Sequence, residues 1–228
     1  MKIGLFGGTF NPIHRCHVLV AQQTRELLSL DRILFIPSAD PPHKPPGTLA
    51  PAHHRAHMVR LAIADDPAFV VSEIELKRSG RSYSIDTVHE LGTEYGPGTE
   101  LFFIVGLDAF VEFPTWRQAS ELLTLCHFVV ISRPGGTFGR LAGLQPLPSI
   151  DSTALLALDA GHLDRLVVPL PSGHSLTLLR LPPCDASASD IRQRLRQGLS
   201  VANLLPPQIE SYIIRFRLYQ EDSNLSGV

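Results

Sequence analysis

The chain has 228 residues, of which 44% are hydrophobic and 18% are charged, and its formal net charge is −2. A chain of this length buries about 70% of the surface that its unfolded form exposes, so disorder over the whole length is excluded. Because no basic excess is available to bind a phosphate backbone, we expect no nucleic-acid partner.

The three cysteines, Cys16, Cys126 and Cys184, are odd in number and widely spaced. This pattern indicates neither a disulfide framework nor a zinc ribbon, and it favours a reducing compartment. The first apolar run is too short for a signal peptide, and no stretch of about 18 uncharged apolar residues predicts a transmembrane helix. We therefore expect a cytoplasmic protein without a membrane partner.

The first half of the chain alternates short apolar runs with longer amphipathic stretches. The apolar runs predict strands over residues 2–6, 32–37, 69–76 and 101–105. The amphipathic stretches predict helices over residues 14–30, 52–64 and 84–95. Residues 38–51 include the run PPHKPPG, whose prolines exclude a helix, and we expect a loop there.

The second half is less regular. We predict helices over residues 116–125, 189–197 and 206–219. We predict strands over residues 127–132, 166–170 and 175–181. Residues 133–153 hold glycines and prolines without a sustained period, and we expect a long surface loop or irregular insertion there.

Strands that alternate with helices over this length predict an α/β fold. We expect a single Rossmann-like domain over residues 1–220, with a doubly wound, mostly parallel sheet flanked by helices. Residues 136–174 are its irregular part, and residues 221–228 form a polar tail. Ligands of such sheets bind beyond the carboxyl ends of the strands, so the loops after the first, second and fourth predicted strands are candidate sites.

The loop after the first predicted strand reads GGTFNPIHRCH, from Gly7 to His17. Its two glycines allow a sharp turn and a close approach to a ligand, and the helix that follows offers free N–H groups to phosphate. His14 and His17 are three residues apart and share one face of the first helical turn. From spacing alone, a tight turn with two surface histidines remains an alternative to a phosphate-binding loop.

Two histidine patterns raise the question of a metal ion. His14, Cys16 and His17 cannot all face one ion from the start of a helix, and no fourth ligand stands at a metal-site spacing. His53 and His57 are four residues apart, but the segment HHRAH lacks the glutamate of a metalloprotease HExxH motif. We expect no metal site built from protein side chains.

The first loop resembles the GGTFDPxHxGH signature of nucleotidyltransferases that carry an HxGH motif. Other segments resemble one branch of them, the bacterial nicotinate-nucleotide adenylyltransferases. These segments are PSADPPHKP, HRAHMVRLAIAD, EIELKRSGRSYSIDTV, FIVGLDAFVEFPTW, VISRPG and SASDIRQRLRQG. They follow one another in order along nearly the whole chain, and the part that fails to match is about residues 136–174.

The resemblance implies adenylyl transfer in NAD biosynthesis. Nicotinate mononucleotide attacks the α-phosphate of ATP, giving nicotinate adenine dinucleotide and pyrophosphate. A phosphate monoester has its second pKa at about 6, so the acceptor is already an anion at pH 7 and no protein nucleophile is required. The implied partners are ATP and nicotinate mononucleotide, and the implied cofactor is Mg²⁺, held mainly by phosphates and water.

The resemblance assigns the catalytic roles to His17, His14 and Arg192. His17 would stabilise the transition state on the α-phosphate, and His14 would support the ATP phosphates beside it. Arg192 lies in SASDIR, which is similar to the family motif ISSTxIR, and its planar fork suits phosphate oxygens. From the residues alone, Ser187 and Asp190 also fit a simple capped helix with a solvated arginine.

Further ATP-binding residues are implied in the same two segments and in the loops between them. They are Gly7, Gly8, Thr9, Phe10, Lys44, Ser187, Ser189 and Arg133. Apart from the resemblance, Lys44 would be interpreted as a solvated surface residue, and Arg133 carries the weaker assignment of bordering the adenine pocket.

The resemblance places the nicotinate nucleotide near Tyr83, Ser84, Asp108 and Trp116. Asp108 follows a predicted strand and would accept ribose hydroxyls, whereas the indole of Trp116 would stack on the pyridine ring. Backbone N–H groups in the segments around Ser84 and Trp116 would bind the nicotinate carboxylate. Apart from the resemblance, Trp116 fits a core position.

Two residues of the first loop depart from the family pattern: Asn11 stands for an aspartate, and Cys16 stands for the glycine of HxGH. A side chain at position 16 is expected to crowd the loop. A sister adenylyl- or cytidylyltransferase, for example one acting on pantetheine phosphate, would share this loop but not SYSIDT or FPTW. The sequence also leaves open a non-catalytic dinucleotide sensor, a small module of class I aminoacyl-tRNA synthetase type, and a homo-oligomer.

Overall fold

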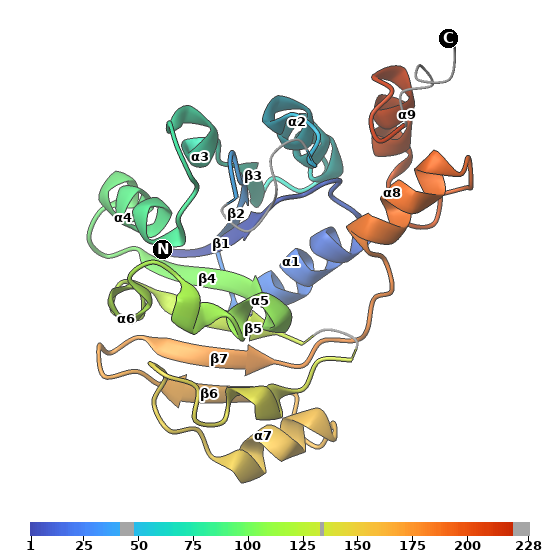
Figure 1. Ribbon diagram of the computed structural model, residues 1–228. Helices are drawn as coiled ribbons and strands as arrows, with labels where there is room; N and C mark the ends of the chain where they lie inside the picture. The colour runs from blue at the N-terminus through green and yellow to red at the C-terminus, as the bar shows by residue number, and fades with distance from the viewer. Residues whose placement is uncertain (42–47, 133–134, 221–228) are drawn as a thin grey trace.

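The computed structural model describes residues 1–41, 48–132 and 135–220. In these ranges seven strands form one sheet in the order β3-β2-β1-β4-β5-β7-β6 (Figure 1). The strands are β1 (Lys2–Gly8), β2 (Arg32–Pro37), β3 (Phe69–Val71), β4 (Glu100–Gly106), β5 (His127–Ile131), β6 (Arg165–Pro169) and β7 (Ser175–Leu179). Neighbouring strands run parallel, except that β6 is antiparallel to β7.

The strand order reverses direction between β1 and β4. The chain builds outward from β1 through β2 to β3, and then returns to place β4 on the other side of β1. This is the doubly wound arrangement expected from the sequence, and the prediction of a mostly parallel α/β sheet is confirmed. At such a reversal the loops beyond the two strands diverge and leave a crevice, so a ligand is expected beyond the carboxyl ends of β1 and β4.

Helices cover both faces of the sheet. One face carries α1 (Arg15–Leu28), α2 (Ala52–Ala62), α8 (Ala188–Arg196) and α9 (Pro207–Arg215). The other face carries α4 (Ser84–Tyr95), α5 (Leu107–Phe110), α6 (Ala119–Leu122) and α7 (Ser152–Asp159). Successive residues of each strand point to opposite faces, so β4 contributes Phe103 to one core layer and Ile104 to the other.

Residues 69–76 do not form the single strand that their apolar pattern predicts. The strand β3 ends at Val71, and a short helix, α3 (Ile74–Lys77), follows it. The amide of Ser72 still donates to the carbonyl of Phe35, but the chain then leaves the edge of the sheet. Glu75 turns inward and accepts a hydrogen bond from the Thr87 hydroxyl at 2.9 Å, which a strand would not allow.

The segment that we expect to be irregular contains regular structure. A 3-10 helix, η2 (Phe138–Leu141), and the helix α7 lie there, and α7 sits beside the β6 edge of the sheet in Figure 1. The carboxylate of Asp159 accepts the backbone amides of Phe138 and Gly139 at 2.6 and 3.0 Å, which joins the two pieces. The expectation of an irregular part over residues 136–174 is therefore wrong where η2 and α7 form.

The helix predicted over residues 116–125 is shorter in the structure. A 3-10 helix, η1 (Phe113–Thr115), precedes Trp116, and α6 covers only Ala119–Leu122. Gln118 has a φ of 53°, a left-handed conformation that interrupts the helix before α6 begins. Within the described ranges, we find no helix with both the length and the apolar character needed to cross a membrane.

Candidate functional site

A cavity of about 510 Å³ opens beyond the carboxyl ends of the central strands. Phe6 of β1, Gly106 of β4 and Ile131 of β5 are among its lining residues. The start of α1 and the segment before α8 contribute other parts of the lining. The cavity therefore lies where the reversal of strand order predicts a ligand site.

The first loop takes its shape from the packing of Phe10. This residue has a φ of 46°, and its side chain is buried against Phe6 and Phe35. A Cβ atom on Gly8 would stand 3.1 Å from the Phe10 ring, so Gly8 gives the ring its space, whereas a Cβ on Gly7 would meet nothing within 4 Å. The buried Phe10 side chain thus anchors the loop to the core. The loop therefore presents its backbone to a phosphate.

His14 and His17 form a fixed pair at the start of α1. The backbone N–H of His14 donates to Nδ1 of His17 at 3.2 Å, and both residues line the cavity. Because Nδ1 accepts this hydrogen bond, the proton of a neutral His17 ring resides on Nε2. The edge of the His17 ring also packs against Phe10, with ring centroids 5.2 Å apart. His17 is therefore held as an N–H donor.

Arg55 is a residue that the sequence interpretation missed. It is 1% exposed, and its guanidinium donates to three backbone carbonyls: Ala50 at 2.9 Å, Thr9 at 2.7 Å and Ala39 at 3.2 Å. Burial lowers the pKa of Arg55, and the three hydrogen bonds offset the cost of burying its charge. One side chain thus joins the first loop, the loop after β2 and the start of α2.

The position of Arg55 in the sequence carried a signal for this role. It stands three and four residues before Met58 and Val59, which form the buried stripe of α2. A charged residue in such a stripe must find polar partners inside the protein. The sequence does not say which partners these are.

Asn11 is a second centre of hydrogen bonds in the first loop. Its Oδ1 accepts the amide of Ala50 at 3.0 Å and the hydroxyl of Tyr219 at 2.9 Å. Its backbone carbonyl accepts Nη1 of Arg192 at 2.7 Å. Burial raises the pKa of Tyr219, which keeps its hydroxyl protonated as the donor. Asn11, which departs from the family pattern, is therefore anchored through its two oxygen atoms, whereas its Nδ2 is buried and no hydrogen-bond partner is found for it among the described residues.

The start of α8 is the other helix N-terminus at the cavity. Ser187 is the N-cap of this helix, and its hydroxyl accepts the amide of Asp190 at 3.1 Å. Arg192 donates through Nη1 to the Asn11 carbonyl and through Nη2 to the Ser189 hydroxyl at 3.3 Å. Arg192 is therefore no freely solvated surface arginine, because it connects α8 to the first loop.

The structure brings part of the predicted ATP-binding set together. His14, His17 and Ser187 line one cavity, and Arg192 and Ser189 adjoin it through the contacts above. Lys44 and Arg133 lie outside the described residues. Among the described residues, no group of three or more His, Cys, Asp or Glu side chains could hold a metal ion.

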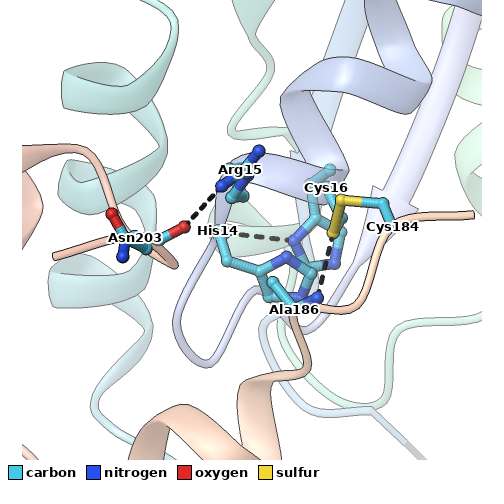
Figure 2. Close-up of a disulfide and its surroundings, with 7 residues drawn as sticks. His14, Arg15, Cys16, Cys184, Ala186 and Asn203 are labelled. Carbon is cyan, nitrogen blue, oxygen red and sulfur yellow. Dashed lines mark hydrogen bonds between the residues drawn. A yellow bond between two sulfur atoms is a disulfide. The ribbon is translucent and has the colours of Figure 1, made fainter. Parts of the chain in front are cut away.

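The prediction that the cysteines form no disulfide is wrong. Cys16 and Cys184 are joined by a disulfide, with their Cα atoms 5.7 Å apart (Figure 2). Their separation of 168 residues hides this proximity in the sequence, because only the fold brings the start of α1 next to the segment before α8. Cys126 is free and buried. The side chain of Cys16 is also buried, and the amide of Ala186 donates to its sulfur at 3.3 Å.

The predicted nicotinate residues fall into two places. Asp108, in the first turn of α5, lines the cavity. Tyr83 and Ser84 lie at the N-terminus of α4, where Arg117 stands over the Tyr83 ring at 4.9 Å. Trp116 packs edge-on against Phe103 at 5.8 Å, so its ring is partly buried in the core. Tyr83, Ser84 and Trp116 are not part of the cavity lining.

Carboxylates surround the N-terminus of α4. Asp86 pairs with Arg117 at 3.4 Å, and Glu75 lies buried under Thr87. Burial raises the pKa of Glu75, while the Thr87 hydroxyl donates to its carboxylate. The first-turn amides of α4 have no partner inside the helix and can receive an anion.

Known proteins that are similar in sequence match nearly the whole chain. Residues 5–194 match the family model described as cytidylyltransferase-like. A protein of Pelobacter propionicus named "Probable nicotinate-nucleotide adenylyltransferase" is 44% identical over 221 residues, which are 97% of this chain and 99% of that protein. A protein of Geobacter metallireducens with the same name is 40% identical over 222 residues, or 97% of this chain and 100% of the other.

The fold has counterparts among solved structures. The Plasmodium falciparum nicotinic acid mononucleotide adenylyltransferase complexed with NaAD matches with a TM-score of 0.70 at 20% identity, covering 96% of this chain and 97% of that one. The structure of that enzyme complexed with APC matches with a TM-score of 0.68 at 19% identity, covering 96% of both chains. These likenesses confirm the Rossmann-like fold.

Proposed function

The chain belongs to the cytidylyltransferase-like family, in its branch of nicotinate-nucleotide adenylyltransferases, and we propose that it performs adenylyl transfer in the cavity beyond β1 and β4. It transfers AMP from ATP to nicotinate mononucleotide, giving nicotinate adenine dinucleotide and pyrophosphate, a step of NAD biosynthesis. The observation that carries this proposal is the convergence of the His14–His17 pair and the N-cap of α8 on one cavity.

The reaction requires that the two substrates are held in position and that the negative charge developing on the α-phosphate is stabilised. A phosphate oxygen of nicotinate mononucleotide attacks the α-phosphorus, and the bond from that phosphorus to the bridging oxygen of pyrophosphate breaks. Nε2–H of His17 donates to a non-bridging α-oxygen, where negative charge develops. Its tautomer is already set by the His14 amide, so no rearrangement precedes the step.

The leaving pyrophosphate faces the start of α8. The first-turn amides of α8 and the hydroxyls of Ser187 and Ser189 receive the β- and γ-phosphates, and the backbone of Gly7, Gly8 and Thr9 borders them. Arg192 turns from the Asn11 carbonyl to neutralise the charge on the leaving group. As the resemblance implies, Lys44 completes this set, and Arg133 borders the adenine pocket.

Magnesium fits this site only as a companion of the nucleotide. The described residues form no cluster that would hold the ion, whereas a triphosphate offers it oxygen ligands. We propose that Mg²⁺ is held by phosphates and water, where it supplies neutralisation of the phosphate charge.

The acceptor binds toward the N-terminus of α4. The first-turn amides of Ser84 and Ile85, with the backbone amide of Arg117, donate to both oxygens of the nicotinate carboxylate. The amide of Trp116 already donates to the carbonyl of Phe113 at 2.9 Å. Asp108 accepts the ribose hydroxyls. An amide in place of the carboxylate turns an NH₂ group toward one of these donors and leaves the donor unpaired, at a cost of about 1–3 kcal/mol.

The decisive experiment measures pyrophosphate release from ATP with a panel of acceptors. We expect nicotinate mononucleotide to exceed nicotinamide mononucleotide by about tenfold or more in kcat/KM. Asp108→Asn is the matched control, because it should weaken both acceptors equally and leave their ratio unchanged. Equal use of both acceptors would contradict the donor-lined pocket. Activity with pantetheine phosphate alone would indicate a sister transferase, and binding without turnover would indicate a sensor.

We also propose that the enzyme works in the cytoplasm, where ATP and the acceptor nucleotide are available. In that compartment thiols are kept mostly reduced, and the disulfides that do form are usually transient, which bears on the Cys16–Cys184 pair. A homo-oligomer stays a prediction, and light scattering on the purified protein measures it directly.

A further inference from the structure

The segment between β7 and α8 is attached to the rest of the site in an unusual way. Residues 182–186 have no helix or strand, and Pro182 and Pro183 have no N–H group to donate. In the described part of the chain, one disulfide, from Cys184, and one hydrogen bond, from Ala186, attach these residues, and both go to the sulfur of Cys16. Between the anchored residues Leu181 and Ile191, the covalent and hydrogen-bond attachment of this segment therefore runs through one sulfur atom.

The disulfide joins the two helix N-termini of the proposed ATP site. Cys16 is the second residue of α1 and stands between His14 and His17, whereas Cys184 stands three residues before Ser187. Figure 2 shows the bond crossing from the start of α1 to the coil segment that carries Cys184 and Ala186. Both cysteines, both histidines and Ser187 line the same cavity.

We propose that Cys16 and Cys184 form a thiol–disulfide exchange site that sets the affinity of the enzyme for ATP. In the disulfide form, Ser187, the N-cap of α8, is held next to the first turn of α1, which carries His17. The groups that bind the phosphates are then in place before ATP binds. In the dithiol form, residues 182–187 lose their covalent tether and keep only the hydrogen bond from Ala186 to the sulfur of Cys16, so ATP must order them further when it binds. This inference rests on the proposed function, because it concerns regulation of the same site.

The exchange has a reductant of defined class and a defined direction. Cys184 is half-buried between exposed neighbours, whereas Cys16 is 7% exposed, so a small dithiol reaches the sulfur of Cys184. One thiolate of the reductant attacks the sulfur of Cys184 and breaks the protein disulfide. Cys16 leaves as a thiolate. The second thiol of the reductant then attacks the mixed disulfide, which releases Cys184 and the oxidised, cyclic reductant. Two electrons pass from the dithiol to the protein.

Cys16 is suited to be the leaving group. The Ala186 amide already donates to its sulfur, and the positive end of α1 favours a thiolate at this position. A sulfur with these two supports is the better leaving group in an exchange reaction.

Other contacts keep α8 and the His17 turn in place after reduction. Arg15 still donates through its side chain to the carbonyl of Asn203 at 2.7 Å and through its amide to the carbonyl of Leu204 at 3.1 Å, and Ile191 of α8 stays buried in the core. The orientation of His17 depends on the His14 amide and on Phe10, neither of which involves the disulfide. Reduction should therefore raise the KM for ATP more than it lowers kcat.

The test compares the enzyme purified without reductant with the same enzyme treated with dithiothreitol. Thiols are counted in denaturant, and we expect one per chain before treatment, from Cys126, and three afterwards. We expect the KM for ATP to rise on the order of tenfold on reduction, and the Kd for ATP measured by calorimetry to rise with it. A low-molecular-weight disulfide should restore both values.

Two variants separate this effect from general damage. Cys184→Ser should show the high KM in either buffer and no response to the reductant, whereas Cys126→Ala should respond as the parent chain does. Because the parent chain is compared with itself, the result stands even if a variant fails to fold.

Three outcomes would overturn a proposal, and they are distinguishable. Three free thiols after treatment with the oxidant would exclude the exchange site. A changing thiol count with an unchanged KM and Kd for ATP would exclude its effect on the nucleotide. Absence of turnover in both states would overturn the proposed function instead, while calorimetry would still decide the inference.

Discussion

The starts of α1 and α8 face the same cavity, but the fold supports them in different ways. Several contacts hold the loop before α1: Phe10 is packed in the core, Arg55 donates to the Thr9 carbonyl, and Oδ1 of Asn11 accepts two hydrogen bonds. The segment before α8 has no comparable support within the described ranges, and its attachment runs through the sulfur of Cys16. Two helix N-termini at one cavity, capped by His14 and Ser187, thus differ in the contacts that support the segments before them.

This difference separates two tasks of the enzyme. A group that stabilises a transition state must be in place before the reaction, since reorganisation would cost part of its benefit. A group that binds the leaving phosphates can instead become ordered with the substrate and move when the product leaves. The rigid α1 turn suits the first task, and the tethered α8 turn suits the second.

The largest effect on activity should follow from removing the N–H donor of His17 at the start of α1. His17→Ala should lower kcat by roughly 10²–10³, because one transition-state donor is lost. The expected effect on the melting temperature is small, since the ring fills no closed core position. Steady-state rates with saturating ATP measure the change, and His162→Ala, an exposed histidine, is the control. Parental turnover in His17→Ala would remove His17 from the mechanism.

The support of the rigid loop can be tested at Arg55. Arg55→Met keeps much of the side-chain volume but leaves the carbonyls of Thr9, Ala39 and Ala50 without their donor. We expect the free energy of unfolding to fall by about 3 kcal/mol or more. Denaturant unfolding measures this loss. Arg60→Met is the matched control on α2, because the exposed pair of Arg60 with Glu73 is worth about 1 kcal/mol or less. Equal losses in the two variants would contradict the anchoring role.

The connection between α8 and the loop before α1 can be weakened at Arg192. Arg192→Lys keeps the charge but cannot bond the Asn11 carbonyl and the Ser189 hydroxyl together in the same geometry. We expect the KM for ATP to rise about tenfold, because a lysine binds phosphate without the planar fork. Arg196→Lys, an exposed position on the same helix, should leave the KM unchanged. If lysine at 192 serves as well as arginine, a general positive charge is sufficient there.

The smallest effect should come from the cap of the tethered helix. Ser187→Ala removes the acceptor for the Asp190 amide, and the loss of an N-cap costs about 1 kcal/mol. The same change should raise the KM for ATP by a few-fold at most, since the first-turn amides remain. Thermal unfolding and ATP titration measure both effects, with Ser200→Ala as the exposed control. A stability loss as large as that of Arg55→Met would show that this segment is anchored as firmly as the first loop.

Local patterns in the sequence were sufficient for most of the fold. The buried runs of β1, β2, β4 and β5 lie within a residue or two of their predicted positions, and α4 covers the predicted residues 84–95. A period of two or 3.6 residues is a property of neighbouring positions, so it is visible without the fold. The same holds for the N-cap at Ser187, whose partner is three residues away. The first loop was found because its glycines and histidines lie within one short segment.

What the sequence left undecided depends on contacts between distant positions. The inward turn of Glu75 that ends β3 needs Thr87, and the order of the region around η2 and α7 needs the carboxylate of Asp159. The roles of Arg55 and of the Cys16–Cys184 pair are of the same kind. Composition and spacing could supply the residues of these contacts, but only the packing of the sheet and its helices decided which of them meet, because proximity across 168 residues leaves no trace in local order.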